Sequence, residues 1–128
     1  MLTVNLDSAV PLIDQLVRGL RHAIAAGTLE PGSELPPVRQ LANDLGINLN
    51  TVARAYRMLE ARGLVRAARG RGTRVTASRE RAAADPPQRK ARLAEELRAV
   101  LADAKLAGMD RAALERMIDR QLDTLWPS

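Results

Sequence analysis

Between residues 46 and 57, the sequence GINLNTVARAYR places small polar side chains ahead of two guanidinium groups. Asn50 and Thr51 come first, and Arg54 and Arg57 follow three residues apart. An amide can bridge the N6 and N7 groups of adenine, and a guanidinium group binds phosphate or guanine. If the segment is helical, the two arginines share its outer face. The chemistry indicated is recognition of a nucleic-acid duplex.

Residues 64–76, LVRAARGRGTRVT, predict a short hairpin with a basic tip. We expect strands at Leu64–Val65 and Arg74–Thr76, joined through Gly70–Gly72, because glycine adopts tight-turn conformations at little cost. The arginines around this tip are Arg69, Arg71 and Arg74. Arginine favours phosphates and the negative potential of a narrow minor groove, so such a hairpin could follow a duplex backbone or enter that groove.

The positive charge of the chain is concentrated in the block that holds both features. The 128 residues carry a formal net charge of +5 and have a sequence pI of 10.9. Residues 54–74 contain seven arginines and one acid, Glu60, whereas residues 79–128 contain ten basic and nine acidic residues. A generally basic protein does not require such concentration, which therefore predicts an anionic partner bound at one place.

Residue types that many enzymes and metal sites need are missing from the sequence. It has no cysteine and a single histidine, His22, and its carboxylates are grouped only as pairs on predicted helical surfaces. Disulfides, thiol chemistry and paired histidine ligands are excluded, so we expect no enzymatic activity, no cofactor and no metal. The sequence also lacks an apolar stretch of about 18 residues and a basic-then-apolar leader, which predicts a soluble cytoplasmic protein with no membrane partner.

Three helices are expected to position the polar groups. Apolar periodicity predicts them over residues 11–26, 37–45 and 49–62. Gly46 would end the second helix in a left-handed conformation, and Asn48 would cap the third. Ala42 is small where these two helices must touch, and Val52 would lie buried beneath the third. A helix, a glycine turn and a second helix form a helix-turn-helix, whose second helix presents its N-terminal residues to the major groove.

Two residues of this motif have simpler structural interpretations, which we favour. Asn48 is more readily explained as a helix cap than as a base contact. Tyr56 follows Val52 at a four-residue spacing and is more readily explained as part of the core than as a platform for stacked bases. Because aromatic residues make up only 2% of the chain, the rest of that core must be aliphatic.

The C-terminal third of the chain predicts a helical hairpin that needs a partner. We divide the sequence into a winged helix-turn-helix domain over residues 1–78, a linker or elbow over 79–88 around Pro86-Pro87, and a helical region over 89–128. Helices are expected over residues 89–107 and 111–125, and about 38 residues cannot bury two apolar seams well alone. Either the first domain or a second copy would cover them. The seam residues are Leu93, Leu97, Val100, Leu101, Leu114, Ile118, Leu122 and Leu125.

Residues 11–76 resemble the DNA-binding region of the GntR family of bacterial transcription regulators. The resemblance is carried by PLIDQL, GTLEPGSELPPVRQLA, TVARAYRML and GRGTRV. The run NLNTVARAY is similar to the YtrA-type branch, which has a short helical C-terminal region. The resemblance implies a mainly α fold, with a winged helix-turn-helix that binds operator DNA and a helical hairpin that serves homodimerisation. Members of this branch often repress neighbouring transporter operons, so a repressor is implied.

The resemblance also implies which residues contact DNA. They are Arg39, the segment Asn48, Leu49, Asn50 and Thr51, and the wing residues Arg69, Gly70, Arg71, Gly72 and Thr73. Two positions depart from the family pattern. Pro37 stands where serine is usual, which removes a hydroxyl cap, and Leu49 stands where many members carry arginine, so their base preference does not transfer.

Three functions remain open at this point. The first is a homodimer that reads a palindromic operator, the second an interaction module that uses the winged helix as a scaffold, and the third a non-specific architectural DNA binder. The basic third helix favours DNA over a protein partner. No effector is identified by the sequence, and an inducer would have to act at the dimer seam or at the elbow over residues 79–88.

Overall fold

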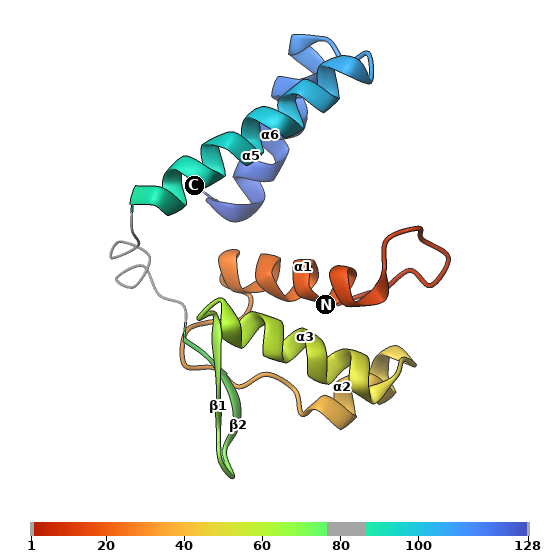
Figure 1. Ribbon diagram of the computed structural model, residues 1–128, viewed down its shortest axis with the longest axis vertical. Helices are drawn as coiled ribbons and strands as arrows, with labels where there is room; N and C mark the ends of the chain where they lie inside the picture. Colours follow the sequence, from red (N-terminus) through yellow and green to blue (C-terminus); the bar gives the residue numbers. More distant parts are fainter. Residues whose placement is uncertain (1, 77–86, 128) are drawn as a thin grey trace. The chain divides into compact units, whose positions relative to one another are not determined.

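Helices form most of the structure, a computed structural model that describes residues 2–76 and 87–127. The chain divides into two compact units, Met1–Ser78 and Arg79–Ser128. The first contains α1 (Leu12–Ala25), α2 (Val38–Leu45), α3 (Leu49–Ala61), β1 (Val65–Ala68) and β2 (Gly72–Val75); the second contains α5 (Pro87–Leu106) and α6 (Arg111–Leu125) (Figure 1). The expected fold class is confirmed, with three helices and a two-stranded wing followed by a helical hairpin.

The core of the first unit is aliphatic and lies where α3 meets α1 and α2. Each helix contributes the apolar face that its periodicity predicts. Tyr56 is the one aromatic side chain in this core, which confirms its interpretation as a core residue. The buried residues are Leu16, Val17, Leu20, Leu29, Leu35, Leu41, Ala42, Val52, Ala55, Tyr56, Leu59, Val65 and Val75.

The turn between α2 and α3 has the expected left-handed glycine. Gly46 has a φ of +68°, and the N–H of Ile47 donates to the carbonyl of Ala42 over 3.0 Å. A side chain at position 46 would meet no atom within 4 Å, so the backbone conformation alone favours glycine here. This bend lets α3 leave the turn while Ala42 stays buried against it.

The segment before α1 is held by one side chain of that helix. Gln15 Nε2 donates to the carbonyls of Asn5 and Val10, and Gln15 Oε1 accepts from the N–H of Asn5 over 2.8 Å. Further along α1, the side chain of Leu2 occupies the space that a Cβ at Gly19 would need. Gln15 therefore holds the N-terminal segment by hydrogen bonds, and Gly19 leaves room for Leu2 to pack against α1.

The hairpin is longer than expected, and a third segment pairs with it. Its register runs from Val65 opposite Val75 to Ala68 opposite Gly72, so pairing extends to the tip, and Leu64 and Thr76, both expected in strands, lie outside them. Gly72, expected in the turn, begins β2. The segment 32–35 follows the outer edge of β2, where the N–H of Leu35 donates to Thr73 O and the N–H of Val75 donates to Ser33 O.

The second unit is a pair of helices with no buried side chain among residues 88–127. Gly108 has a φ of +87° at the bend, and Asp110 caps α6 by accepting from the N–H of Ala113 over 2.8 Å. Helix α5 begins at Pro87, inside the stretch expected to be linker, because proline is well tolerated in a first helical turn. The remaining expected linker, residues 79–86, lies outside the described residues.

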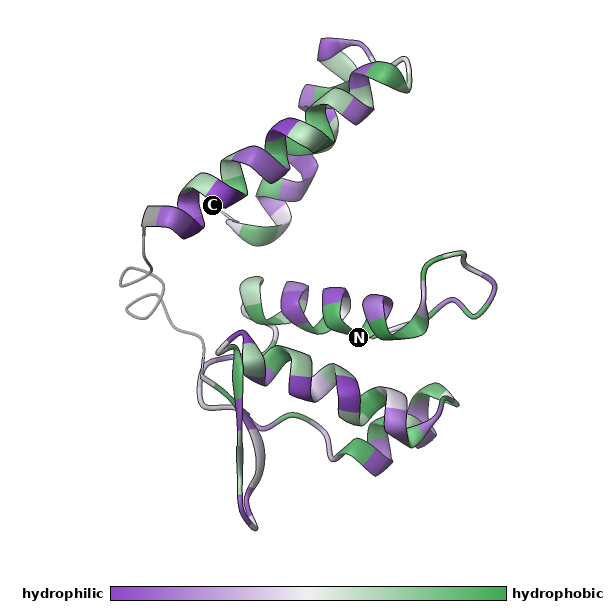
Figure 2. Cartoon of the chain, in the orientation of Figure 1, coloured by the Kyte–Doolittle hydropathy of each residue, from purple (hydrophilic) through white to green (hydrophobic). Residues whose placement is uncertain are grey.

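The hydrophobic side chains of this helical pair stay largely open to solvent. Leu93, Leu97 and Val100 on α5 are 57%, 55% and 59% exposed, and hydrophobic positions recur along both helices (Figure 2). Leu101, Leu114, Ile118 and Leu125 are half-buried. Within the described part of the chain, neither these helices nor the others are long and apolar enough to cross a bilayer.

The buried Tyr56 predicts a loss of stability at alkaline pH. Its hydroxyl donates to the carbonyl of Pro36 over 2.6 Å, and burial raises its pKa from 10.0 to about 12. Because the folded state holds the proton more tightly than the unfolded state, this stability is complete below pH 10 and is lost as the pH rises toward 12. Urea unfolding from pH 8 to pH 12 should show the loss, and Tyr56→Phe should remove this component.

Absorbance offers a direct check, since Tyr56 is the only tyrosine in the chain. The phenolate signal of the folded protein should appear about two pH units later than that of the unfolded protein. An unshifted folded titration would contradict the assignment.

Candidate nucleic-acid interface

The N-terminus of α3 is capped as the sequence predicts. Asn48 has extended backbone angles, and its Oδ1 accepts from the N–H of Asn50 over 2.7 Å. The cap therefore uses one end of the Asn48 amide, and a contact with a base would use the Nδ2 donor at the other end. The first-turn N–H groups of α3 also favour an anion at this end of the helix.

One face of α3 presents polar and basic groups to solvent. Asn50, Arg54 and Arg57 are exposed, and their spacing of four and three residues places them along one side of the helix. Thr51 is half-buried, and Leu49 is 40% exposed beside it. The opposite face of α3 supplies core residues, so the fold holds the polar face outward.

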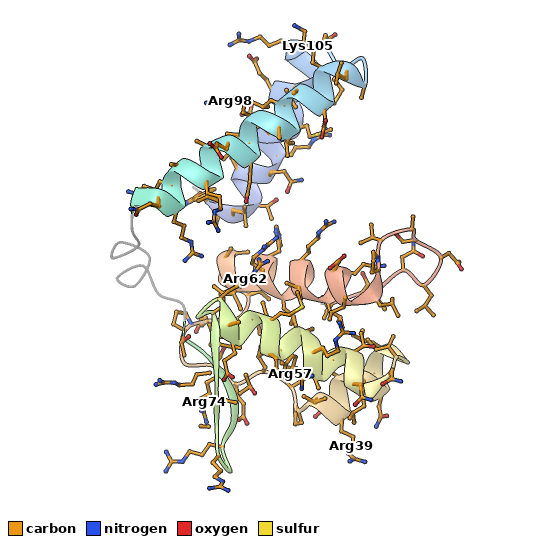
Figure 3. The ribbon with its side chains drawn as sticks, viewed as in Figure 1. Arg39, Arg57, Arg62, Arg74, Arg98 and Lys105 are labelled. Carbon is orange, nitrogen blue, oxygen red and sulfur yellow. The ribbon has the colours of Figure 1, made fainter. Side chains whose placement is uncertain are left out.

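Helix α2 adds a cation close to its start. Arg39 is exposed in the first turn and projects from α2 on the side facing away from α1 (Figure 3). The hairpin of β1 and β2 extends on that same side of the unit (Figure 1). Pro37 precedes the helix without a side-chain cap, as expected from the missing hydroxyl. Arg39 and the hairpin therefore lie on one side of the unit, away from α1.

The three arginines expected around the tip of the wing, the hairpin of residues 65–75, fall into two kinds. Arg69 and Arg71 are exposed in the turn at the tip. Arg74 points back to the body of the unit, where Nη1 donates to the carbonyl of Gly32 over 3.0 Å and Nη2 lies 3.9 Å from Glu34 Oε2. The sequence grouped all three together, whereas the fold gives Arg74 partners inside the unit.

Two local features favour glycine at positions 70 and 72 of the tip. Gly70 and Gly72 have φ values of +76° and +72°, which only glycine adopts at little cost. A side chain at Gly72 would in addition collide with the carboxylate of Glu34. Thr73, the last wing residue implied by the resemblance, is half-buried, and its carbonyl is engaged with Leu35.

Two acids at this surface were not among the expected site residues. Glu60, near the end of α3, accepts from the N–H of Ala67 over 2.6 Å, and Glu34 lies beside Gly72 and Arg74. The sequence could have singled out Glu60, because it is the only acidic residue beside seven arginines in residues 54–74. Glu34 had no comparable signal, since its partner is 40 residues away.

Neither unit presents a metal centre in the described ranges 2–76 and 87–127, where no three His, Cys, Asp or Glu residues cluster suitably. No charged side chain is buried within those ranges. The exposed groups of this surface include amides, guanidinium groups and helix N–H groups, all of which contact nucleic acids in other proteins, together with the carboxylates of Glu34 and Glu60.

Comparisons with known proteins show the family to which the first unit is similar. The family model described as "Bacterial regulatory proteins, gntR family" matches residues 12–75. The HTH-type transcriptional repressor YtrA of Bacillus subtilis is 30% identical over 118 residues, which cover 92% of this chain and 89% of the relative.

Solved structures extend the likeness to the fold. The structure described as a transcriptional antiterminator from Listeria monocytogenes is 25% identical, with a TM-score of 0.85 over 98% of this chain and 92% of that one. The DNA-binding domain of AraR in complex with operator ORX1 is also 25% identical, with a TM-score of 0.53 over 59% of this chain and 93% of that one.

Proposed function

This chain belongs to the gntR family of bacterial regulatory proteins, and we propose that it represses transcription as a homodimer bound to a palindromic DNA operator. It is a transcription regulator of a DNA-binding family, and the proposal concerns its assembly, its target and its effect. The observation that carries the proposal is that the exposed polar and basic residues of α3 and the basic wing tip belong to one compact unit, in which Arg39 and the wing lie on the side away from α1.

We assign recognition of the DNA bases to the first half of α3. Asn50, in the first turn of α3, would meet base edges in the major groove, and Thr51, at the same end, would contact bases or phosphates. Arg54 and Arg57 lie further along the exposed face, where they would bind phosphates or guanine. Leu49 offers an apolar contact, such as the methyl group of thymine.

Backbone binding is assigned to the groups around that helix. Arg39 from α2 and the wing arginines Arg69 and Arg71 would neutralise phosphates or enter the adjacent minor groove. Gly70 and Gly72 let the wing backbone approach the duplex closely. Asn48 serves first as the cap of α3, and its Nδ2 group would be the donor left for a contact with DNA.

The apolar face of the second unit supports a homodimer. Leucines and a valine that are more than half exposed recur at three- and four-residue spacing on α5, and an exposed seam of this kind is covered by a partner in water. A second copy has the same seam, so a twofold axis would pair the two faces. The seam residues assigned are Leu93, Leu97, Val100, Leu101, Leu114, Ile118, Leu122 and Leu125.

A twofold dimer predicts the form of the operator. Two copies of α3 would occupy major grooves about 34 Å apart, or a multiple of that distance, which corresponds to half-sites spaced by whole helical turns. Repression follows if this site overlaps a promoter, and the name of the similar Bacillus protein supports that direction.

Footprinting of the purified full-length chain on DNA upstream of its own gene tests the proposal. We expect one protected region with inverted half-sites, and lower run-off transcription from the promoter it overlaps. Equal protection of random DNA would instead indicate an architectural binder. An absence of DNA binding at low salt would indicate an interaction module, and increased transcription would indicate an activator.

A further inference from the structure

We propose that Glu60 is a positioning residue for DNA recognition, which couples the wing to the recognition helix α3. This inference rests on the proposed binding of an operator. Glu60 belongs to α3, and its carboxylate accepts from the backbone N–H of Ala67 in β1 over 2.6 Å. The bond therefore joins the two elements that would occupy neighbouring grooves.

The two edges of the wing are held in different ways. On the β2 edge, segment 32–35 contributes three backbone hydrogen bonds, between Leu35 and Thr73, between Val75 and Ser33, and between Gly32 and Val75. Arg74 adds its contact with Gly32. This edge is fastened to the body by main chain, which single substitutions leave in place.

The β1 edge has a side-chain tie near the middle of the strand. In an antiparallel pair, residues alternate between bonding the partner strand and pointing their polar groups outward. Ala67 is opposite Thr73, whose carbonyl points outward to Leu35. Ala67 consequently points its N–H to the other outer edge, where Glu60 accepts it. Without this acceptor, the outward N–H of Ala67 has no bond to α3, and the middle of β1 is held through its pairing with β2.

Because Glu60 is negatively charged, the direction in which its removal changes DNA affinity distinguishes a positioning role from a purely electrostatic one. A carboxylate among seven arginines repels DNA, so electrostatics alone predicts that its removal tightens binding to every sequence. A positioning role predicts weaker binding to the operator, because the wing and α3 no longer meet their two grooves in register. The effects are opposite on operator DNA and can be separated.

Three variants of the full-length chain separate charge from hydrogen bonding. Glu60→Gln keeps a hydrogen-bond acceptor but loses the charge. Glu60→Asp keeps the charge, but its side chain is one methylene shorter and the acceptor lies farther from Ala67. Glu60→Ala loses both the charge and the acceptor. Asp44→Ala is the control, because it removes one exposed acid from α2. Dissociation constants would be measured on the footprinted operator and on random DNA of equal length at one salt concentration.

We expect Glu60→Asp and Glu60→Ala to bind the operator roughly 3- to 10-fold more weakly, with random DNA bound as tightly as by the wild type or tighter. Glu60→Gln and Asp44→Ala should keep the wild-type ratio of operator to random affinity. Faster amide exchange at Ala67 in Glu60→Asp would support the same conclusion in the absence of DNA.

Two results would overturn the inference. One is wild-type operator affinity in Glu60→Asp, and the other is an equal loss on operator and random DNA, which would assign Glu60 to general fold integrity. Thermal unfolding of each variant shows whether it is folded. Failure of the wild-type chain itself to prefer its operator would refute the proposed function instead.

Discussion

The double variant Leu97→Glu, Leu122→Glu is expected to be monomeric and to bind the full palindrome at least ~100-fold more weakly than the wild type. Both leucines are exposed in the single chain, at 55% and 45%, so glutamate should not disturb the fold of the hairpin. In a dimer seam, however, each glutamate would be desolvated without a partner. A monomer binds only one half-site at a time, so the gain in affinity from binding both half-sites together is lost.

Sedimentation equilibrium measures the first part of this prediction, and titration of whole and half operators measures the second. Affinity for an isolated half-site should remain at the wild-type value, because the substitutions lie outside the first unit. A matched control, Ala102→Glu with Gln121→Glu, places the same charges at exposed positions of the same helices. If the leucine variant stays dimeric, this face is not the dimer seam.

Asn50→Ala is expected to remove discrimination at one operator position, by about 1–3 kcal/mol, or roughly 5- to 150-fold. The Asn50 side chain is exposed, and the cap of α3 uses its backbone N–H, so the substitution keeps both fold and cap. Binding to random DNA should therefore change little, since phosphate contacts supply most of that affinity.

Selection of bound sequences from a randomised operator measures the effect directly. The preferred base at one position in each half-site should become degenerate, while all other positions keep their preferences. Asn43→Ala provides the control, because it removes an exposed asparagine from α2 instead of α3. An equal loss on operator and random DNA would show that Asn50 does not read a base.

Much of the first unit could be predicted because its signals are local. Gly46 and Asn48 lie within a few residues of the helix ends that they define, and their left-handed φ and capping bond both appear in the structure. Tyr56 was assigned to the core from a four-residue spacing alone, and it is buried there. The exposed position of Asn50 follows from the same periodicity, whereas its contact with a base remains a prediction.

Local patterns were less informative where the chain changes from one element to another. The pairing of the wing extends to Ala68 and Gly72, where Gly72 pairs in a left-handed conformation that glycine adopts at little cost. Helix α5 starts at Pro87, although the paired prolines suggested a break. A proline disrupts the helical turn that precedes it but is well tolerated at the first position of a helix. Pro87, the second proline of the pair, can therefore begin α5.

By itself the sequence determined the helices, the glycine turn, the polar front of α3 and the place where basic charge accumulates, because each depends on residues within about one helical turn. Only the tertiary structure decided which of these charges have partners within the unit. Arg74 is bound to Gly32, 42 residues away, and Glu60 meets Ala67 through the path of the hairpin. Such contacts depend on how distant segments pack, which no local spacing specifies.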